Sequence, residues 1–272
     1  MRVKFLSLIL FVLILLFSSC SSDGTFSDTS GYKLNEELER YLYINLPQFQ
    51  KERQRIYYVE WGKLTKTSEN DSVYIFSEMQ DAEDIQTLIY MVVEANGQLM
   101  IQELGNSDKM VIQNGNVFLA DMDGDAIDEI IVHFEISGNG GTITRVYKVD
   151  NDAIELFADL NQFDTGFQSM YEPGYKLRVF NRFTQSVYFV DIANWFSEDA
   201  FDEKGLALVK ENIEIRPFYS CKAKYSDISG KFELHCMQEV RLGGHIGNVY
   251  TVIQYNEAEK IFEVIKSDFI RS

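Results

Sequence analysis

The chain has few of the residues that mark disordered or fibrous proteins. Its 272 residues contain only three prolines and 17 glycines. This composition excludes a collagen-like or intrinsically disordered chain. The hydrophobic residues make up 46% of the sequence and the aromatic residues 14%, which is enough apolar material for a folded protein with a buried core.

Positive charge is also scarce. The sequence has 25 Lys and Arg residues against 42 Asp and Glu residues, and its formal net charge is −17 at pH 7. Nucleic acids and anionic lipid headgroups attract basic surfaces. The charge balance therefore excludes nonspecific nucleic-acid binding and electrostatic recruitment to an anionic membrane, and it disfavours acidic partners.

No long hydrophobic run follows residue 20, and the apolar run before it, over residues 5–17, is short. Two basic residues precede this run, and Ser18, Ser19 and Cys20 follow it. A helix that crosses a membrane needs about 20 apolar residues, so this layout predicts an export signal instead.

The small residues before Cys20 resemble a bacterial lipobox, with Phe17 where Leu is usual. The resemblance implies that residues 1–19 are a lipoprotein signal peptide and that Cys20 carries acyl chains such as palmitate. Residues 20–33 would then be a flexible tether to the cell membrane or the outer membrane, on its extracytoplasmic side. Two acyl chains anchor a protein stably. The alternatives are an ordinary secretory signal with a buried cysteine, or an uncleaved signal anchor.

The rest of the chain divides into a helix and a β domain. Residues 34–54 have apolar side chains at helical spacing and predict one N-terminal helix. From residue 55 to 272 the pattern changes to period-two runs rich in Val, Ile, Tyr and Phe, separated by turn formers, which predict antiparallel strands. We also expect a helical excursion at 192–206. The predicted strands are 55–61, 72–76, 87–94, 99–104, 117–121, 129–136, 142–149, 176–180, 186–192, 232–240, 249–255 and 262–265.

About a dozen strands without alternating helices predict an all-β fold, either a β-propeller or a large sandwich or barrel. Three segments repeat faintly at irregular spacing, which indicates degenerate units instead of a uniform array.

One acidic stretch carries the clearest chemistry. Asp121, Asp123 and Asp125 alternate through a tight turn, and Glu129 follows eight residues after the first. Calcium binds six to eight oxygens, which these carboxylates and the backbone carbonyl of Ile127 can supply. Without a cation, the crowded acids should repel one another. The sequence predicts one structural calcium site here, and the alternative is a solvated turn that binds no ion tightly.

These residues resemble the DxDGDGxxD loop of FG-GAP or VCBS-type repeats, which lies between blade strands in integrin-like β-propellers and in bacterial lipoproteins of that kind. The resemblance implies irregular or degenerate β-propeller-like antiparallel sheets, calcium in the loop, and no enzymatic activity. Ala126 stands where the family has glycine in a left-handed conformation. That costs about 1–2 kcal/mol and predicts weak affinity for the ion.

The sequence also predicts that two cysteines face each other. Cys221 and Cys236 are symmetric about a turn centred between Ile228 and Ser229, so a hairpin there places them in register. Outside the cytoplasm this pair can form a disulfide, and otherwise it packs as two reduced thiols.

Catalytic motifs are not found around the three histidines. His133 and His235 lie in predicted strands, and His245 lies in a glycine-flanked segment that is a candidate ligand loop. We interpret the chain as a non-enzymatic, membrane-anchored binding or scaffolding module with an unknown protein or glycan ligand. The alternatives are a surface glycan hydrolase with two converging carboxylates, and a passive envelope component with an exposed apolar patch.

Overall fold

The computed structural model describes residues 36–45, 54–68, 70–79, 87–105, 112–136, 141–196, 198–208, 213–242 and 244–271. The predicted signal peptide, Cys20 and the tether lie outside these residues, as do residues 34–35 and 46–53 of the predicted helix. Gln54, the last residue of that predicted helix, instead begins a β-strand.

A short N-terminal helix is confirmed. Helix α2 covers Glu36–Asn45. Leu38 and Leu42, one turn apart, are buried in a cluster with Tyr74 and Phe76 of strand β2 (Asp71–Met79). The side of the helix that carries Leu38 and Leu42 therefore packs against the first β-sheet.

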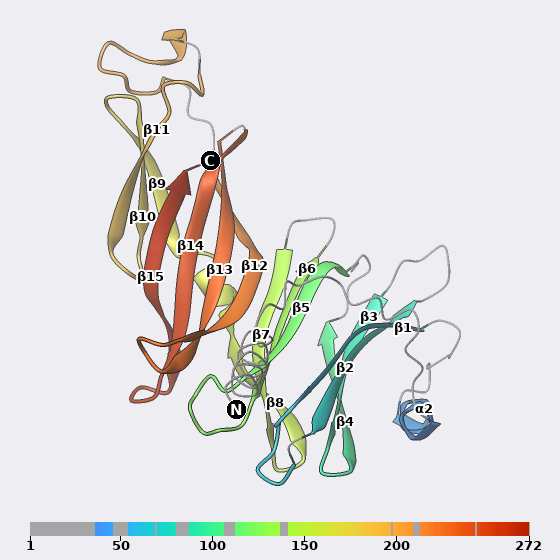
Figure 1. Ribbon diagram of the computed structural model, residues 1–272. Helices are drawn as coiled ribbons and strands as arrows, with labels where there is room; N and C mark the ends of the chain where they lie inside the picture. Colours follow the sequence, from blue (N-terminus) through green and yellow to red (C-terminus); the bar gives the residue numbers. More distant parts are fainter. Residues whose placement is uncertain are drawn as a thin grey trace, which may run out of the picture. The chain divides into compact units, whose positions relative to one another are not determined.

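In the part of the chain that the structure describes, the strands form four antiparallel sheets, each a meander in which strands consecutive in sequence pair (Figure 1). The first sheet contains β1 (Gln54–Gly62), β2 (Asp71–Met79), β3 (Thr87–Ala95) and β4 (Gln98–Gly105), and the second contains β5 (Ile112–Ala120), β6 (Glu129–Ile136), β7 (Gly141–Asp150) and β8 (Ala153–Asp159). The third sheet contains β9 (Phe167–Glu172), β10 (Lys176–Asn181) and β11 (Ser186–Asp191). The fourth contains β12 (Glu214–Ser226), β13 (Lys231–Leu242), β14 (Gly244–Asn256) and β15 (Ile261–Arg271). This confirms the all-β class.

The predicted helical excursion at 192–206 is wrong for the part of it that the structure describes. That part contains a single 3₁₀ turn, η4 (Glu198–Ala200), and an isolated bridge between Phe201 and Ala207. The Asp202 carboxylate accepts hydrogen bonds from the backbone N–H groups of Lys204 and Leu206. Because the side chain replaces helical hydrogen bonding, the segment turns instead of winding into an α-helix.

The middle strands of the β5–β8 sheet, β6 and β7, are buried on both faces. On β6, Ile130 and Val132 belong to a hydrophobic cluster shared with the β1–β4 sheet. Ile131, which points to the other face, belongs to a second cluster shared with the β12–β15 sheet. Two-sided burial explains why three apolar residues, Ile130, Ile131 and Val132, follow one another in this strand.

The β12–β15 sheet buries one face, which two different sheets cover along its length. Along β13, alternate residues are buried. Leu234 and Cys236 contribute to the cluster with the β5–β8 sheet. Val240 and Leu242 contribute to a third cluster with the β9–β11 sheet. The hydrophobic clusters of the described residues thus join the sheets in an order that differs from their order in the sequence, and they show no closed propeller.

A polar contact lies where these two clusters meet. Gln238 is fully buried on the shared face of β13, and its Nε2 donates to the backbone carbonyls of Asp164 and Arg216, at 3.1 and 3.0 Å. The Asp164 carboxylate, just after the 3₁₀ turn η3 (Leu160–Phe163), accepts a hydrogen bond of 3.1 Å from the N–H of Phe218. These bonds fix the segment between β8 and β9 to the β12–β15 sheet.

Asp164 makes the stability of this junction depend on pH. Burial raises the pKa of its carboxyl from 3.8 to about 6, against the opposing effect of the Phe218 N–H. The folded state therefore keeps the proton that the unfolded state loses, so this contribution to stability is complete below about pH 3.8 and is lost as the pH rises through about 6.

We expect Asp164→Asn, which keeps the acceptor and cannot ionise, to be more stable than the wild type above pH 7. The gain should be on the order of 1–2 kcal/mol and should shrink toward about pH 4. Urea unfolding across this pH range measures it, with the exposed Asp227→Asn as the control. Identical pH profiles for wild type and Asp164→Asn would contradict the assignment.

Candidate cation-binding loop

The acidic stretch forms the connection between β5 and β6. Ala120 and Glu129 pair at the base of this hairpin, so residues 121–128 form the loop. The sequence prediction that the loop lies between two antiparallel strands of one sheet is confirmed.

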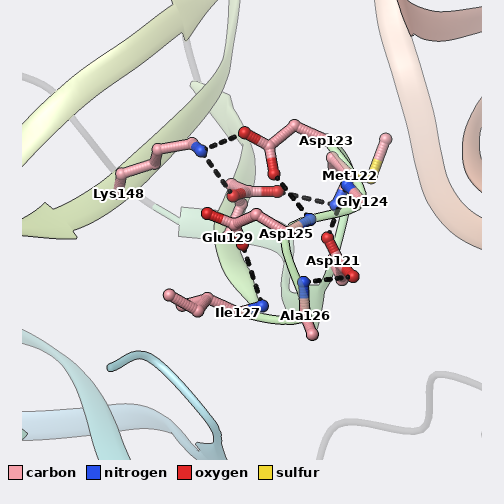
Figure 2. Close-up of polar contacts among 9 residues, drawn as sticks. All are labelled: Asp121, Met122, Asp123, Gly124, Asp125, Ala126, Ile127, Glu129 and Lys148. Atoms are coloured by element: carbon pink, nitrogen blue, oxygen red, sulfur yellow. Dashed lines mark hydrogen bonds and ion pairs between the residues drawn. The ribbon is translucent and has the colours of Figure 1, made fainter. Parts of the chain in front are cut away.

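Asp121 organises the loop through both of its oxygens. Its Oδ1 accepts a hydrogen bond of 2.7 Å from the N–H of Gly124, and its Oδ2 accepts one of 2.9 Å from the N–H of Ala126 (Figure 2). Asp123 and Asp125 make similar bonds further along, to the N–H groups two residues after each. The carboxylates therefore hold the loop through hydrogen bonds to its own backbone.

Ala126 adopts the conformation that the sequence comparison with the DxDGDGxxD pattern predicted. Its φ is 65°, and Gly124 has a φ of 82°. For an alanine this left-handed conformation is strained by about 1–2 kcal/mol. The hydrogen bond from its N–H to Asp121 offsets part of that cost.

Glu129 is the buried member of the group, with 1% of its surface exposed. Its Oε2 accepts a hydrogen bond of 2.6 Å from the N–H of Met122. Burial raises the pKa of Glu129 to about 7, and the charge of Lys148 keeps it from rising further. A buried carboxylate requires a cation or hydrogen-bond donors around it.

Lys148, on the adjacent strand β7, supplies that cation. Its ammonium contacts Asp123 Oδ2 and lies 3.1 Å from Glu129 Oε1, as Figure 2 shows. The same nitrogen lies 4.3 Å from the centre of the Phe157 ring. Although burial alone lowers the pKa of Lys148, the two carboxylates outweigh it and raise the pKa. The acidic loop therefore contains an internal counter-ion.

Three carboxylates of the loop converge. Asp121, Asp123 and Glu129 each offer one oxygen, and these oxygens lie within 4.8 Å of one another. Hard carboxylate oxygens suit calcium or another hard divalent cation. Of the predicted ligands, Asp125 is exposed and lies outside this group, and Ile127 contributes its N–H to the Asp125 carboxylate.

Neighbouring segments hold the loop in place. Asp128 accepts a hydrogen bond of 2.9 Å at Oδ2 from the N–H of Lys63, and its own N–H donates to the Lys63 carbonyl at 2.7 Å. Gly62 leaves room for this contact, because a Cβ there would lie 2.8 Å from the same Oδ2. On another side, Glu257 of the β14–β15 turn lies 3.4 Å from the position of a Cβ on Gly124.

The sequence did not identify Asp128 or Lys148 as site residues. Asp128 occupies an unspecified position of the loop pattern, and its partner is 65 residues away. Lys148 follows Tyr147, the cross-strand partner of Ile130, so it lies beside Glu129 once β6 and β7 pair. Opposite charges at neighbouring cross-strand positions were the available signal, but they become visible only when the register is known.

The histidines are distributed over two sheets. His133 is buried and pairs with Thr144 Oγ1 at 2.9 Å. His235 contacts the Tyr250 hydroxyl and lies 3.5 Å from Glu233. His245, the candidate ligand loop residue, is exposed at the start of β14, and its Nε2 lies 3.0 Å from the Gly247 carbonyl.

The predicted facing of the cysteines is confirmed. Cys221 on β12 pairs directly with Cys236 on β13, and residues 227–230 form the turn between the two strands. Both side chains are buried.

No protein-family model, no curated protein and no solved structure matches this chain. The FG-GAP or VCBS resemblance of the loop therefore stays a prediction. The helices in the described part of the chain include none that is both long and apolar enough to span a bilayer.

The bond between Asp128 and Lys63 provides a test of how the loop is positioned. We expect Asp128→Ala to lower the free energy of unfolding by about 1–2 kcal/mol, because the half-buried N–H of Lys63 loses its acceptor. Asp128→Asn keeps an acceptor oxygen and should lose much less. Chemical denaturation of both variants measures the difference. Equal stability of Asp128→Ala and the wild type would show that the hydrogen bond from Lys63 to Asp128 does not stabilise the fold.

Proposed function

We propose that this protein is a lipid-anchored, extracytoplasmic binding or scaffolding module whose acidic loop holds one divalent cation, calcium, in a structural role. The observation that supports the ion is the convergence of Asp121, Asp123 and Glu129 within 4.8 Å. The ligand of the module would be a protein or a glycan. The net charge of −17 is unsuited to nucleic acid.

The cation would exchange with the ammonium of Lys148. Lys148 contacts Asp123 and Glu129, two of the three converging carboxylates. Calcium would replace this single positive charge by two and would bind the oxygens directly, with waters or backbone carbonyls completing its shell. Because Lys148 already compensates the charge, the loop would be ordered with or without calcium, and the ion would add modest stability.

The kinship with FG-GAP or VCBS repeats would be confined to the β5–β8 sheet. This sheet is a four-stranded meander with the acidic loop between its first two strands. A blade of a β-propeller has the same strand order. The β-propeller-like relationship proposed here is therefore one of a single blade-like unit in an irregular β structure.

The membrane anchor would be Cys20. Its support is the sequence alone: a basic start, a short apolar run and two serines before the cysteine. Two or more acyl chains on Cys20 would hold the module at the cell membrane or outer membrane. The acidic body would be repelled by anionic headgroups, so the polar segment after Cys20 would keep it away from the surface.

Calcium should raise the melting temperature of the wild-type protein relative to chelator. With a dissociation constant of about 0.1 mM and about 1 mM calcium, mass action adds about 1.4 kcal/mol, or a shift of about 3–6 °C. Magnesium at the same concentration should do less, because it prefers a tighter octahedral shell.

The variant Lys148→Met tests whether calcium and the ammonium of Lys148 compete for the same carboxylates. Without calcium, this variant should be less stable than the wild type by roughly 2–4 kcal/mol, because Glu129 loses its buried partner. With calcium, it should gain more stability than the wild type does, since no ammonium competes. The exposed Lys66→Met controls for the loss of a positive charge. If calcium shifts neither wild type nor Lys148→Met, the ion is excluded and Lys148 is the permanent counter-ion.

Mass spectrometry of the detergent-extracted protein tests the anchor. We expect an N-terminal Cys20 carrying acyl chains, and we expect Cys20→Ser to prevent this processing. An intact signal segment or an unmodified Cys20 in the wild type would contradict the anchor without affecting the calcium experiment.

A further inference from the structure

We propose that Cys221 and Cys236 form a cross-strand disulfide that joins β12 to β13 in the exported protein. This inference rests on the extracytoplasmic location in the proposed function, because disulfides persist in oxidising compartments. The evidence for the pair itself is geometric.

The two cysteines are in the required positions. They are direct partners in the β12–β13 register, and the exposed fraction of each is 0%. Their Sγ atoms lie 2.9 Å apart in the thiol form that the structure holds. A disulfide has an S–S length of about 2.05 Å. The two Sγ atoms therefore need to approach each other by roughly 0.9 Å to form the bond. Small rotations of the two side chains provide this without a change of strand register.

The surroundings favour a structural bridge over a reactive one. Both cysteine side chains lie in the cluster that includes Ile131 of strand β6 and Met122 of the loop before it. Burial, together with the Cys221 thiol and the Asp164 charge, raises the pKa of the Cys236 thiol well above its ordinary value. Thiolates are the reactive form, so the folded pair is protected from exchange. The bond would therefore form during folding, before the β5–β8 sheet covers this face.

The chemistry is a thiol–disulfide exchange with a disulfide-carrying oxidoreductase of the extracytoplasmic space. The thiolate of one cysteine attacks the oxidant's disulfide, forming a mixed disulfide and releasing one oxidant thiol. The thiolate of the other cysteine then attacks the protein sulfur of the mixed disulfide and releases the second oxidant thiol. The two cysteines lose two protons and two electrons, which the oxidant gains.

The bridge would stabilise the hairpin that supports the shared face of the β12–β15 sheet. It closes a loop of about 15 residues around the turn at 227–230, which limits the freedom of the unfolded chain. For a domain of this size, we expect reduction to lower the melting temperature by about 6–12 °C.

Peptide mapping of the membrane-extracted wild-type protein tests the bond directly. The protein is alkylated in denaturant without reductant, digested and analysed by mass spectrometry. We expect the peptides of Cys221 and Cys236 to be linked, lighter by two hydrogens than the two thiol peptides together, and to separate on reduction. Recovery of both cysteines in alkylated form would overturn the proposal.

The same experiment shows whether Cys20 carries acyl chains. Failure of the disulfide proposal can therefore be distinguished from failure of the proposed membrane anchor. Acylated Cys20 with alkylated Cys221 and Cys236 overturns the bridge and leaves the anchor. Linked peptides with an unmodified Cys20 support the bridge and contradict the anchor.

Melting provides the second measurement. Wild type refolded with a phosphine reductant should melt lower than wild type refolded without it, whereas the matched variant C221A/C236A should melt at the same temperature after both treatments. An equal shift in the variant, or no shift in the wild type, would count against the bridge.

Discussion

The middle strands of the β5–β8 sheet, β6 and β7, exclude water from both of their faces at the same time. Alternate residues of β6 pack toward the β1–β4 sheet and toward the β12–β15 sheet. A strand in this position leaves no exposed face on which to place charged residues, so polar groups concentrate in the connections. The acidic loop follows from this constraint, because it begins where the apolar residues of β5 end and is held by backbone and side-chain contacts at its base.

Charge compensation by Lys148 explains how the buried carboxylate at the base of this loop is tolerated. Glu129 is almost completely buried, and the ammonium of Lys148 contacts it together with Asp123. The sequence describes four acids that repel one another, whereas the structure places a cation from the next strand among them. The chain therefore supplies part of the positive charge that these carboxylates require.

Local patterns predicted the strands that alternate or that are uniformly apolar, and they failed where neither pattern is clear. β8 and β9 are mostly exposed or half-buried, with polar residues on both sides. β12 contains Pro217 and several charged residues, and its pairing with β13 shifts register beside Phe218. The Asp spacing and the symmetric cysteines were visible because their geometry is local to one hairpin. Asp128, Lys148 and the junction at Gln238 depend on contacts between distant segments, which a single sequence does not reveal.

Glu257, in the turn between β14 and β15, lies near the tip of the acidic loop, 3.4 Å from the position that a Cβ on Gly124 would take. Lys231 pairs with Glu257, and both side chains are partly exposed to solvent. Dissolved salt screens such an exposed pair strongly and a buried pair such as Lys148 and Glu129 very little. Rising ionic strength would therefore weaken the pair between Lys231 of β13 and Glu257 of the β14–β15 turn first, while Lys148 and Glu129 stayed together. The exposed pair of Lys231 and Glu257 therefore weakens at a lower ionic strength than the largely buried pair of Lys148 and Glu129.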